Sequence, residues 1–440
     1  MLKSNEMIEE LRRYVKVDPY PFAVDIERSK GMYLATVEGR RIFDWAGYFG
    51  AKLLGHNHPG LNDPAYVKHL TLAANNKVAN PDFLTPECLD YYRLLYENAP
   101  QCMRGPGLEV YAVNSGAEAV ENMMKYLLVL HGEKMRTRGG SPAARRFLYF
   151  DRAFHGRTVF ALNITQLSHD PVVTKGFQGI VPGNVQVSFP HIDNSQTPDQ
   201  NDLRTNRALE TIENSLSRYA GEIVGIVAEP LQGAGGHRMA QPRFFQELSR
   251  LAHCYETYLG FDEVQTAGGQ TGALFMCDQM DLPYPPQAVA VAKKFGNGAV
   301  YMLETLGDRG VLDSTWGGNL ADMVRVCREF EIVRKERLIE RVPEKAAVMV
   351  AGLEGLAGKY HDVLFNVRGM GLYQGFSLRR ADDRRRLLEI ALQQEEMLLL
   401  GAGAQSVRFR PVIDVTVEEI RLMIEKLDRC LVRLGSGAFV

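Results

Sequence analysis

The sequence is poor in the features that point to structural metals, disulfides, nucleic acids or membranes. Its 440 residues include six cysteines, which form no CxxC pair and no spacing typical of a metal site. The 51 basic side chains are balanced by 53 acidic ones, so no basic surplus is available for a polyanion. No apolar run approaches the roughly 18 residues of a membrane span. We therefore expect no bound metal, no nucleic-acid or membrane partner, and reduced thiols in a cytoplasmic protein.

Targeting signals and low complexity are missing as well. The first residues, MLKSNEMIEELRR, mix acids with bases and lack the apolar core that a secretory signal would need. The 41 glycines and 20 prolines are close to the average for this length. These absences leave a large α/β protein with ample length for a buried core, and an enzyme is the leading interpretation.

The middle of the chain alternates short apolar runs with helical patterns, which is typical of parallel βαβ units. Helices are expected over 117–130 and 243–256, and strands over 108–113, 146–150, 222–228, 257–261 and 288–292. The pattern predicts a large α/β domain over 60–320 with a mostly parallel central sheet.

The last third of the chain changes character. A long helix is expected over 321–341, a strand-like, glycine-containing segment follows over 367–378, and another helix is expected over 381–397. Thr416 and Glu419 then form a capping box that opens a final amphipathic helix. We expect a smaller α+β domain that is built from both termini, 1–59 together with 321–440.

Chemically useful residues follow each of the five predicted strands. The segments are NSGA (114–117), DRAFHGR (151–157), EP (229–230), DEVQ (262–265) and KK (293–294). Ligands of an open parallel sheet bind beyond the carboxyl ends of its strands, where these segments would meet. Each segment alone has an ordinary explanation, such as a helix start, a cap or a solvated face. Their joint placement at one edge indicates a functional site.

One chemistry uses all of these parts. Pyridoxal phosphate needs a lysine that binds its aldehyde, a carboxylate at its ring nitrogen and a seat for its phosphate. Small residues before a helix, as in NSGA, can hold the phosphate through backbone N–H groups. A buried lysine near neutrality can also shuttle the proton during turnover. Pyridoxal 5'-phosphate is therefore the predicted cofactor.

Several motifs in order carry a resemblance to a known family. They are GRRIFDWAG, GHNHP, NSGAEAVENMMK, FHGRT, EPLQGAGG, FDEVQTAGGQTG, AKKFGNG and VRFRP. With these motifs the chain resembles the class III pyridoxal-phosphate aminotransferases of fold type I, from about Asp25 to the final helix. The motifs LAANNKVANPDFLT (72–85) and STWGGNLADMVR (314–325), with the doubled lysine at 293–294, are most similar to the L-lysine 6-aminotransferases.

The resemblance implies a role for each residue of the predicted site. Ser115, Gly116 and Ala117 are implied to contact the phosphate, and Phe154 and Val264 to contact opposite faces of the ring. Asp262 is implied to bind the ring nitrogen and Gln265 to approach the 3-oxygen. Glu229 is implied to lie beside the cofactor. The family pattern K-G-L-G-G-G places the covalent attachment at Lys293 and leaves Lys294 a structural residue. Lys293, Asp262 and Glu229 are the implied catalytic residues. Thr315 resembles a residue that contacts the phosphate of a partner subunit, which implies a homodimer with a shared active site.

Two arginines are the implied substrate contacts. Arg157 resembles the residue that binds the α-carboxylate of lysine, and Arg408 the one that binds the α-carboxylate of glutamate or 2-oxoglutarate. Many relatives read EPxQGEGG, with a glutamate that pairs with the second arginine when glutamate is absent. Ala234 stands at that position here. The change removes this switch and makes a pyruvate-type acceptor or a different donor more plausible.

The function that the resemblance implies is transfer of a terminal amino group. The expected donor is L-lysine, or a similar ω-amino or diamino acid, and the expected acceptor is 2-oxoglutarate, in a ping-pong reaction. Three alternatives stay open: another class III ω-transaminase that uses ornithine, GABA or an amine with pyruvate, a pyridoxal-phosphate aminomutase or racemase, and a relative without enzyme activity.

Overall fold

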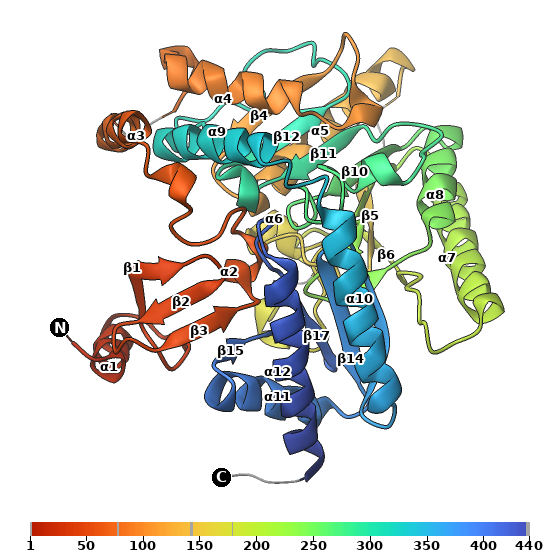
Figure 1. Cartoon of the computed structure of the whole chain (residues 1–440). Helices are drawn as coiled ribbons and strands as arrows, with labels where there is room; N and C mark the ends of the chain where they lie inside the picture. Colours follow the sequence, from red (N-terminus) through yellow and green to blue (C-terminus); the bar gives the residue numbers. More distant parts are fainter. Residues whose placement is uncertain (1, 77–78, 141–143, 178, 437–440) are drawn as a thin grey trace.

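The computed structural model describes residues 2–76, 79–140, 144–177 and 179–436, and Figure 1 shows their arrangement. Residues 77 and 78 of the LAANNKVANPDFLT motif lie outside this described part. Within it, no helix is long and apolar enough to cross a membrane.

A seven-stranded sheet forms the centre of the molecule. Its order is β4 (Glu109–Val113), β12 (Gly298–Met302), β11 (Ala288–Val291), β10 (Tyr258–Asp262), β7 (Ile223–Ala228), β5 (Arg146–Phe150) and β6 (Val185–Val187). Only β12 runs against the others, since it pairs antiparallel with both β4 and β11. The predicted mostly parallel sheet is confirmed, and each of the five predicted strands is present. The short strand β6 and the antiparallel β12 were not predicted.

Helices cover both faces of this sheet. Residues of β7 are divided between two apolar clusters, as a strand buried on both sides requires. Val224 and Val227 join the cluster with side chains of α5 (Gly116–Thr137), and Ile226 joins the cluster with those of α8 (Pro242–Cys254). The helix α7 (Pro198–Arg218) packs beside α8 (Figure 1). Because the helices cover the faces of the sheet, a site can form at the carboxyl ends of its parallel strands.

Two smaller sheets lie outside the central one, and the two ends of the chain meet in the first of them. In the first, β1 (Val24–Lys30), β2 (Tyr33–Thr36) and β3 (Arg41–Asp44) are joined by β15 (Met397–Leu398), which runs parallel to β3. The second has the order β13 (Leu364–Met370), β14 (Tyr373–Leu378), β17 (Ser406–Arg408) and β16 (Leu400–Ala402). The helix α12 (Val417–Ser436) packs against both α10 (Val342–Lys359) and α11 (Ala381–Gln394), and α10 and α11 pack against these strands. The predicted capping box is present, because Thr416 and Glu419 exchange side-chain to backbone hydrogen bonds of 2.8 and 3.1 Å.

The helix predicted over 321–341 is shorter than expected. The helix α9 (Leu320–Lys335) ends where Arg337 adopts a left-handed backbone with φ of 54°. A new helix, α10, begins at Val342 with a proline in its first turn, which fits the missing N–H of proline. The helix α9 packs on α3 (Pro64–Asn76) and α4 (Pro86–Glu97), which belong to the predicted large domain. The domain boundary at 320 stays a prediction.

The remaining elements are short. They are the helices α1 (Ser4–Tyr14), α2 (Gly47–Gly50) and α6 (Val159–Leu162), the strands β8 (Leu231–Gln232) and β9 (Arg238–Met239), and the 3₁₀ helices η1 (Pro59–Leu61), η2 (Pro81–Phe83), η3 (Gln101–Met103), η4 (Pro171–Val173), η5 (Cys277–Gln279) and η6 (Lys293–Phe295).

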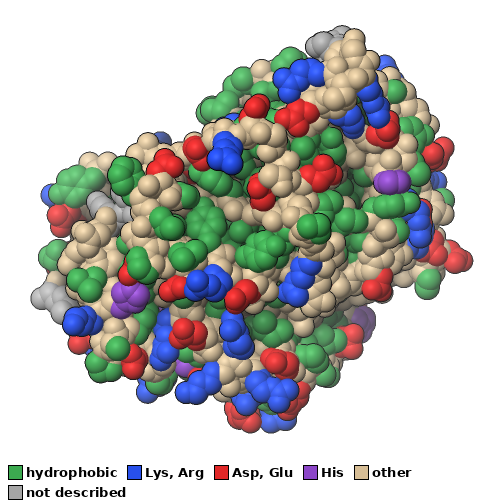
Figure 2. Space-filling view, turned by 90° about the horizontal axis from the view of Figure 1, so that it is seen from above, with side chains coloured by type: hydrophobic (Ala, Val, Ile, Leu, Met, Phe, Trp, Pro, Cys, Tyr) green, Lys and Arg blue, Asp and Glu red, His purple; other side chains and the backbone are tan. Residues whose placement is uncertain are grey.

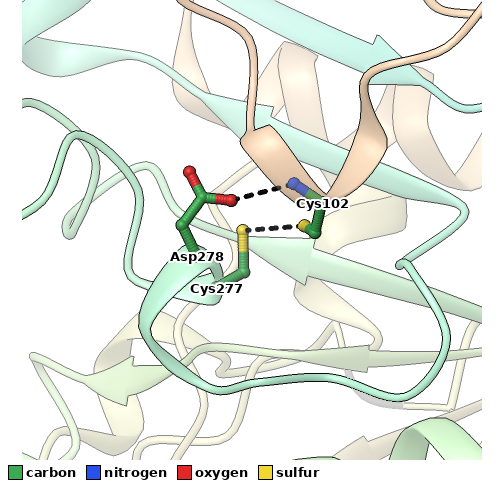
Figure 3. A group of neighbouring side chains, drawn as sticks. All are labelled: Cys102, Cys277 and Asp278. Carbon is green, nitrogen blue, oxygen red and sulfur yellow. Dashed lines mark hydrogen bonds between the residues drawn. The ribbon is translucent and has the colours of Figure 1, made fainter.

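Two distant cysteines become neighbours in this fold. The sulfur atoms of Cys102 and Cys277 lie 3.9 Å apart, and a carboxylate oxygen of Asp278 accepts the N–H of Cys102 at 3.2 Å (Figure 3). The sulfur separation exceeds the roughly 2.05 Å of a disulfide, so both residues are thiols. Sequence spacing could not reveal this contact, because the two positions are far apart along the chain.

Candidate active site

A cavity of about 680 Å³ lies at the carboxyl ends of the central strands. Its volume falls within the roughly 300–1,000 Å³ of small-molecule sites. The lining includes all of the predicted site residues except Thr315, namely Ser115, Gly116, Ala117, Phe154, Arg157, Glu229, Asp262, Val264, Gln265, Lys293 and Arg408. The fold thus brings together residues that are nearly 300 positions apart in the sequence.

Lys293 is the lysine that faces the cavity. It follows β11, opens η6 and has a left-handed backbone, with φ of 55°. Its Nζ atom donates to the carbonyl oxygen of Phe49 at 3.1 Å. Burial lowers the pKa of Lys293 to about 8, and the positive charges of Arg408 and Arg410 act in the same direction. An amine with this pKa can be neutral, and so nucleophilic, near neutral pH.

Lys294 points away from the cavity. Its side chain is buried, and its Nζ donates to the hydroxyl oxygen of Tyr373 at 2.9 Å and to the carbonyl oxygen of Gln265. Burial and the charge of Lys293 hold the pKa of Lys294 well below its usual range. Its bonds tie β14 to the loop after β10, which is a structural role.

Asp262 is held by a histidine that sequence reasoning did not single out. It is the last residue of β10, and its Oδ2 accepts the Nδ1–H of His155 at 2.8 Å. Its Oδ1 accepts the N–H of Val264 at 3.1 Å. Burial alone would lower the pKa of His155, but the hydrogen bond and the charge of Asp262 outweigh it and raise that pKa. The signal was a histidine beside the predicted ring-stacking residue Phe154, but nothing in the sequence paired it with Asp262.

Glu229 supports the loop that carries the aromatic residue. It is buried, and its Oε1 accepts the N–H of Phe154 at 2.9 Å. Burial raises the pKa of Glu229 well above that of a free carboxyl group. The carboxyl group therefore fixes the backbone from which the Phe154 ring enters the cavity.

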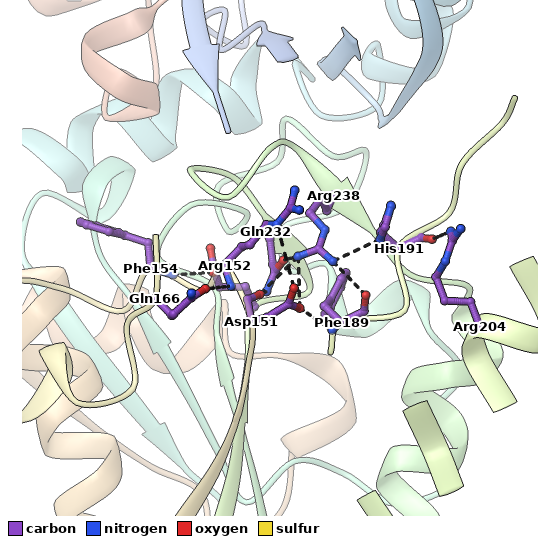
Figure 4. A network of polar contacts seen from close by, with 10 residues as sticks. Asp151, Arg152, Phe154, Gln166, Phe189, His191, Arg204, Gln232 and Arg238 are labelled. Carbon is purple, nitrogen blue, oxygen red and sulfur yellow. Dashed lines mark hydrogen bonds and ion pairs between the residues drawn. The ribbon is translucent and has the colours of Figure 1, made fainter. Parts of the chain in front are cut away.

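A hydrogen-bonded network also holds the loop after β5, which carries Phe154 (Figure 4). The Nη1 atom of Arg238 donates to Gln232 Oε1 at 2.9 Å and to Asp151 Oδ1 at 3.3 Å. Gln232 donates to the carbonyl oxygen of Asp151 at 2.8 Å, and Gln166 accepts the N–H of Arg152 at 2.9 Å. In Figure 4 the ring of Phe154 points away from this network. The polar contacts hold the loop and leave the ring free to contact a ligand.

The start of α5 offers a seat for an anion. Ser115 is its N-cap, and its Oγ accepts the N–H of Glu118 at 3.2 Å. Gly116 and Ala117 follow in the first turn, where backbone N–H groups have no helical partner. A Cβ atom on Gly116 would lie 2.7 Å from Val264, so only glycine permits this close approach. The helix start and the loop after β10 therefore close on one another at the cavity wall.

The two predicted substrate arginines have different surroundings. Arg157 is exposed at the cavity and has no hydrogen bond or ion pair with any residue of the described part. Arg408 is buried, and its Nη1 donates to Gln265 Oε1 at 3.1 Å. Burial lowers the pKa of Arg408 to about 10, so it still carries its charge at neutral pH.

Thr315 lies outside the cavity of its own chain. Its carbonyl oxygen accepts the Nδ2–H of Asn80 at 3.2 Å, which ties two loops together. The carbonyl oxygen of the next residue, Trp316, accepts the Nδ2–H of Asn114 at 2.7 Å, so the Thr315 loop lies near the start of α5 although Thr315 does not line the cavity.

The donor set fits pyridoxal phosphate. A single cavity holds an amine of lowered pKa, a buried carboxylate that a histidine orients, an aromatic ring and an anion seat at a helix start. When bound, the cofactor supplies an aldehyde for the amine and a ring that withdraws electrons. Lys293 would hold the aldehyde, Asp262 the ring nitrogen and residues 115–117 the phosphate.

Comparison with known proteins decides the family. The model of the class III aminotransferase family matches residues 14–431. The chain is a class III aminotransferase. It is therefore a pyridoxal-phosphate-dependent transaminase with the fold type I architecture described above.

The relatives are similar over nearly their whole length. An L-lysine-epsilon aminotransferase of Streptomyces clavuligerus is 30% identical over 439 residues, which cover 97% of this chain and 94% of that protein. One of Mycobacterium bovis is 34% identical over 429 residues, with coverage of 94% and 92%. The solved structure of the M. tuberculosis lysine aminotransferase, in its internal aldimine form, has a TM-score of 0.92, 31% identity and coverage of 98% and 100%.

Proposed function

We propose that this aminotransferase moves the ε-amino group of L-lysine to a 2-oxo acid, with 2-oxoglutarate as the first acceptor to test. The main observation behind this proposal is that two arginines, Arg157 and Arg408, line the same cavity as Lys293. A carboxylate on Arg157, at the exposed side, leaves the long side chain of lysine to reach inward with its amine. The curated relatives named for this activity, at 30–34% identity, support the same donor.

Each residue of the cavity has a task in this reaction. Lys293 would hold the cofactor between turnovers, and its Nζ would move a proton once it is released. Asp262, which His155 holds in place, would keep the ring nitrogen protonated. Phe154 and Val264 would enclose the ring and exclude water, and Gln265 would contact the 3-oxygen. Glu229 fixes the Phe154 loop, which makes it a positioning residue within the set first expected to be catalytic.

The two half-reactions test this proposal directly. We expect L-lysine to bleach the visible band of the bound aldehyde cofactor, and 2-oxoglutarate to restore it. The product of ε-transfer, an amino aldehyde, closes to a cyclic imine that chromatography identifies. Ornithine, GABA and simple amines serve as alternative donors, and pyruvate as the alternative acceptor. Failure of lysine alone to bleach the band would reject lysine as the donor.

We also propose a homodimer that completes the site, working in the cytoplasm, where a reducing environment suits six unpaired thiols. Thr315 lies outside its own cavity, beside exposed apolar side chains: Trp316 is 43% exposed, Leu84 61% and Phe83 82%. Figure 2, which views the molecule from above α4 and α9, shows hydrophobic side chains gathered in the middle of that face. Burial of such side chains against a second copy would stabilise a dimer.

Mixing two inactive variants tests the shared site. In a dimer of Lys293→Ala with Thr315→Ala subunits, one site keeps its own Lys293 and receives an intact Thr315 from the other subunit. An equal mixture, unfolded and refolded together, should regain roughly a quarter of the wild-type activity, since half of the dimers carry one intact site of two. The control is each variant refolded alone. No recovery would show that Thr315 serves its own chain or none.

A further inference from the structure

Neither arginine of the cavity has a carboxylate partner within the described part of the chain. Arg408 is buried, yet its only side-chain acceptor within 3.5 Å is the neutral amide oxygen of Gln265, and its Nε has no partner. Buried arginines are ordinarily paired with an acid. Burial lowers the pKa of Arg408 and the charge of Glu229 partly offsets this, but no carboxylate of the described part is hydrogen-bonded to the guanidinium, and a ligand carboxylate can supply that bond.

The loop beside Arg408 brings no acid to it. Residues 233–236 read Gly-Ala-Gly-Gly, and the methyl group of Ala234 packs with Leu162, Leu167 and Val173. Three carboxylates do line the cavity. Asp262 is bound to His155, Glu229 accepts the Phe154 N–H, and Asp170 makes no hydrogen bond to Arg408. Among the described residues, no carboxylate that lines the cavity is hydrogen-bonded to the guanidinium, which is bonded only to the neutral amide oxygen of Gln265.

A short chain of contacts places Arg408 close to the reacting amine. The carbonyl oxygen of Phe49 accepts from Lys293 Nζ at 3.1 Å and from Gln265 Nε2 at 3.0 Å. The oxygen of the same Gln265 amide then accepts from Arg408 at 3.1 Å. Arg157 is hydrogen-bonded to none of these residues. A carboxylate on Arg408 thus puts the neighbouring α-carbon near Lys293, whereas one on Arg157 puts the far end of lysine there.

We propose that the enzyme also transfers the α-amino group of lysine, because Arg408 stays open to the donor's carboxylate throughout the cycle. The inference rests on the proposed function of the same site. Lysine and 2-oxoglutarate then give 6-amino-2-oxohexanoate and glutamate. The free ε-amine condenses with the new ketone, with loss of water, to a cyclic imine that is an isomer of the ε-transfer product. One cavity therefore gives two products from one donor, according to which arginine binds the carboxylate.

Isotope labelling distinguishes the two orientations. The holoenzyme is given L-lysine labelled with ¹⁵N at either the α- or the ε-nitrogen, together with 2-oxoglutarate, and the label in glutamate is measured by mass spectrometry at early times. We expect label from both positions, at comparable rates. Label from the ε-position alone would overturn the inference and leave the proposed function intact. Label from neither position, in glutamate or in the alanine formed when pyruvate is the acceptor, would reject the proposed function itself.

Ala234 offers a matched pair of variants for the same assay. In Ala234→Glu the new carboxylate can pair with Arg408, and we expect the ratio of α- to ε-transfer to fall by about tenfold, the effect of roughly 1.4 kcal/mol. Ala234→Gln has the same bulk without the charge, and its ratio should stay within about twofold of wild type. An equal fall in both variants would assign the effect to bulk and contradict the role of the open charge.

A binding measurement gives a readout that does not depend on turnover. Propionate, a carboxylate without an amine, should bind the wild-type holoenzyme in calorimetry, and Ala234→Glu should weaken it about tenfold while Ala234→Gln does not. Circular dichroism of each variant shows whether it is folded. Equal propionate affinity in all three proteins would contradict an unpaired Arg408.

Discussion

Replacement of Lys293 by alanine is expected to lower the rate of transamination by about 10⁴-fold, while the protein still folds. Proton transfer by a positioned side chain contributes up to about 10⁴-fold, and Lys293 also holds the cofactor covalently. Within the described part of the chain the side chain makes one hydrogen bond, to the carbonyl oxygen of Phe49, so its loss removes little from the packed core. The measurement is the rate of the lysine half-reaction, followed by the absorbance of the bound cofactor. Borohydride, which fixes the cofactor to its lysine, should label the wild type and fail to label the variant.

Lys294→Met is the matched control for this variant. The two lysines are adjacent and both have lowered pKa values, but only Lys293 lines the cavity. Methionine keeps the buried stem of Lys294 and removes its bonds to Gln265 and Tyr373. We expect Lys294→Met to retain borohydride labelling and to lose mainly thermal stability. Loss of labelling in Lys294→Met together with retention in Lys293→Ala would reverse the assignment of the attachment site.

The lysine pair shows how far the sequence could lead. The apolar runs predicted the strands, because a strand buried on both faces must be apolar throughout, and the residues after each run predicted the edge where the site forms. The family pattern chose Lys293 over Lys294, and the structure shows the physical difference: one amine faces the cavity and the other is buried against Tyr373.

Contacts between distant segments were beyond the reach of the sequence. The antiparallel β12 is as apolar as its parallel neighbours, so its direction follows from the sheet and not from its residues. The helix predicted over 321–341 divides because the backbone turns left-handed at Arg337, a residue with no preference for that turn. His155 and Asp262 are 107 positions apart, and the pair exists only once β10 and the loop after β5 are neighbours.

The pair of His155 and Asp262 carries the second large expected effect. Asp262→Asn keeps the size of the side chain and its capacity to accept from His155, but it removes the charge that faces the ring nitrogen. We expect the rate of the lysine half-reaction to fall by about 10³-fold, since a preorganised charge in a buried site is worth at least as much as one oxyanion donor. His155→Asn is the matched variant. It leaves the carboxylate in place and should cost about 10–100-fold, as is usual for a residue that orients another.

The pH dependence of stability separates the charge from the packing in this pair. Asp262 raises the pKa of His155 in the folded protein, so the pair contributes stability below the unfolded pKa of about 6.5, and that contribution is lost as pH rises through the folded pKa. Asp262→Asn should therefore lower the melting temperature more at pH 6 than at pH 9, measured on the cofactor-free protein so that the ring nitrogen plays no part. An equal loss at both pH values would show that the carboxylate supports His155 by shape alone, and the 10³-fold loss of rate would then have to arise wholly at the ring nitrogen.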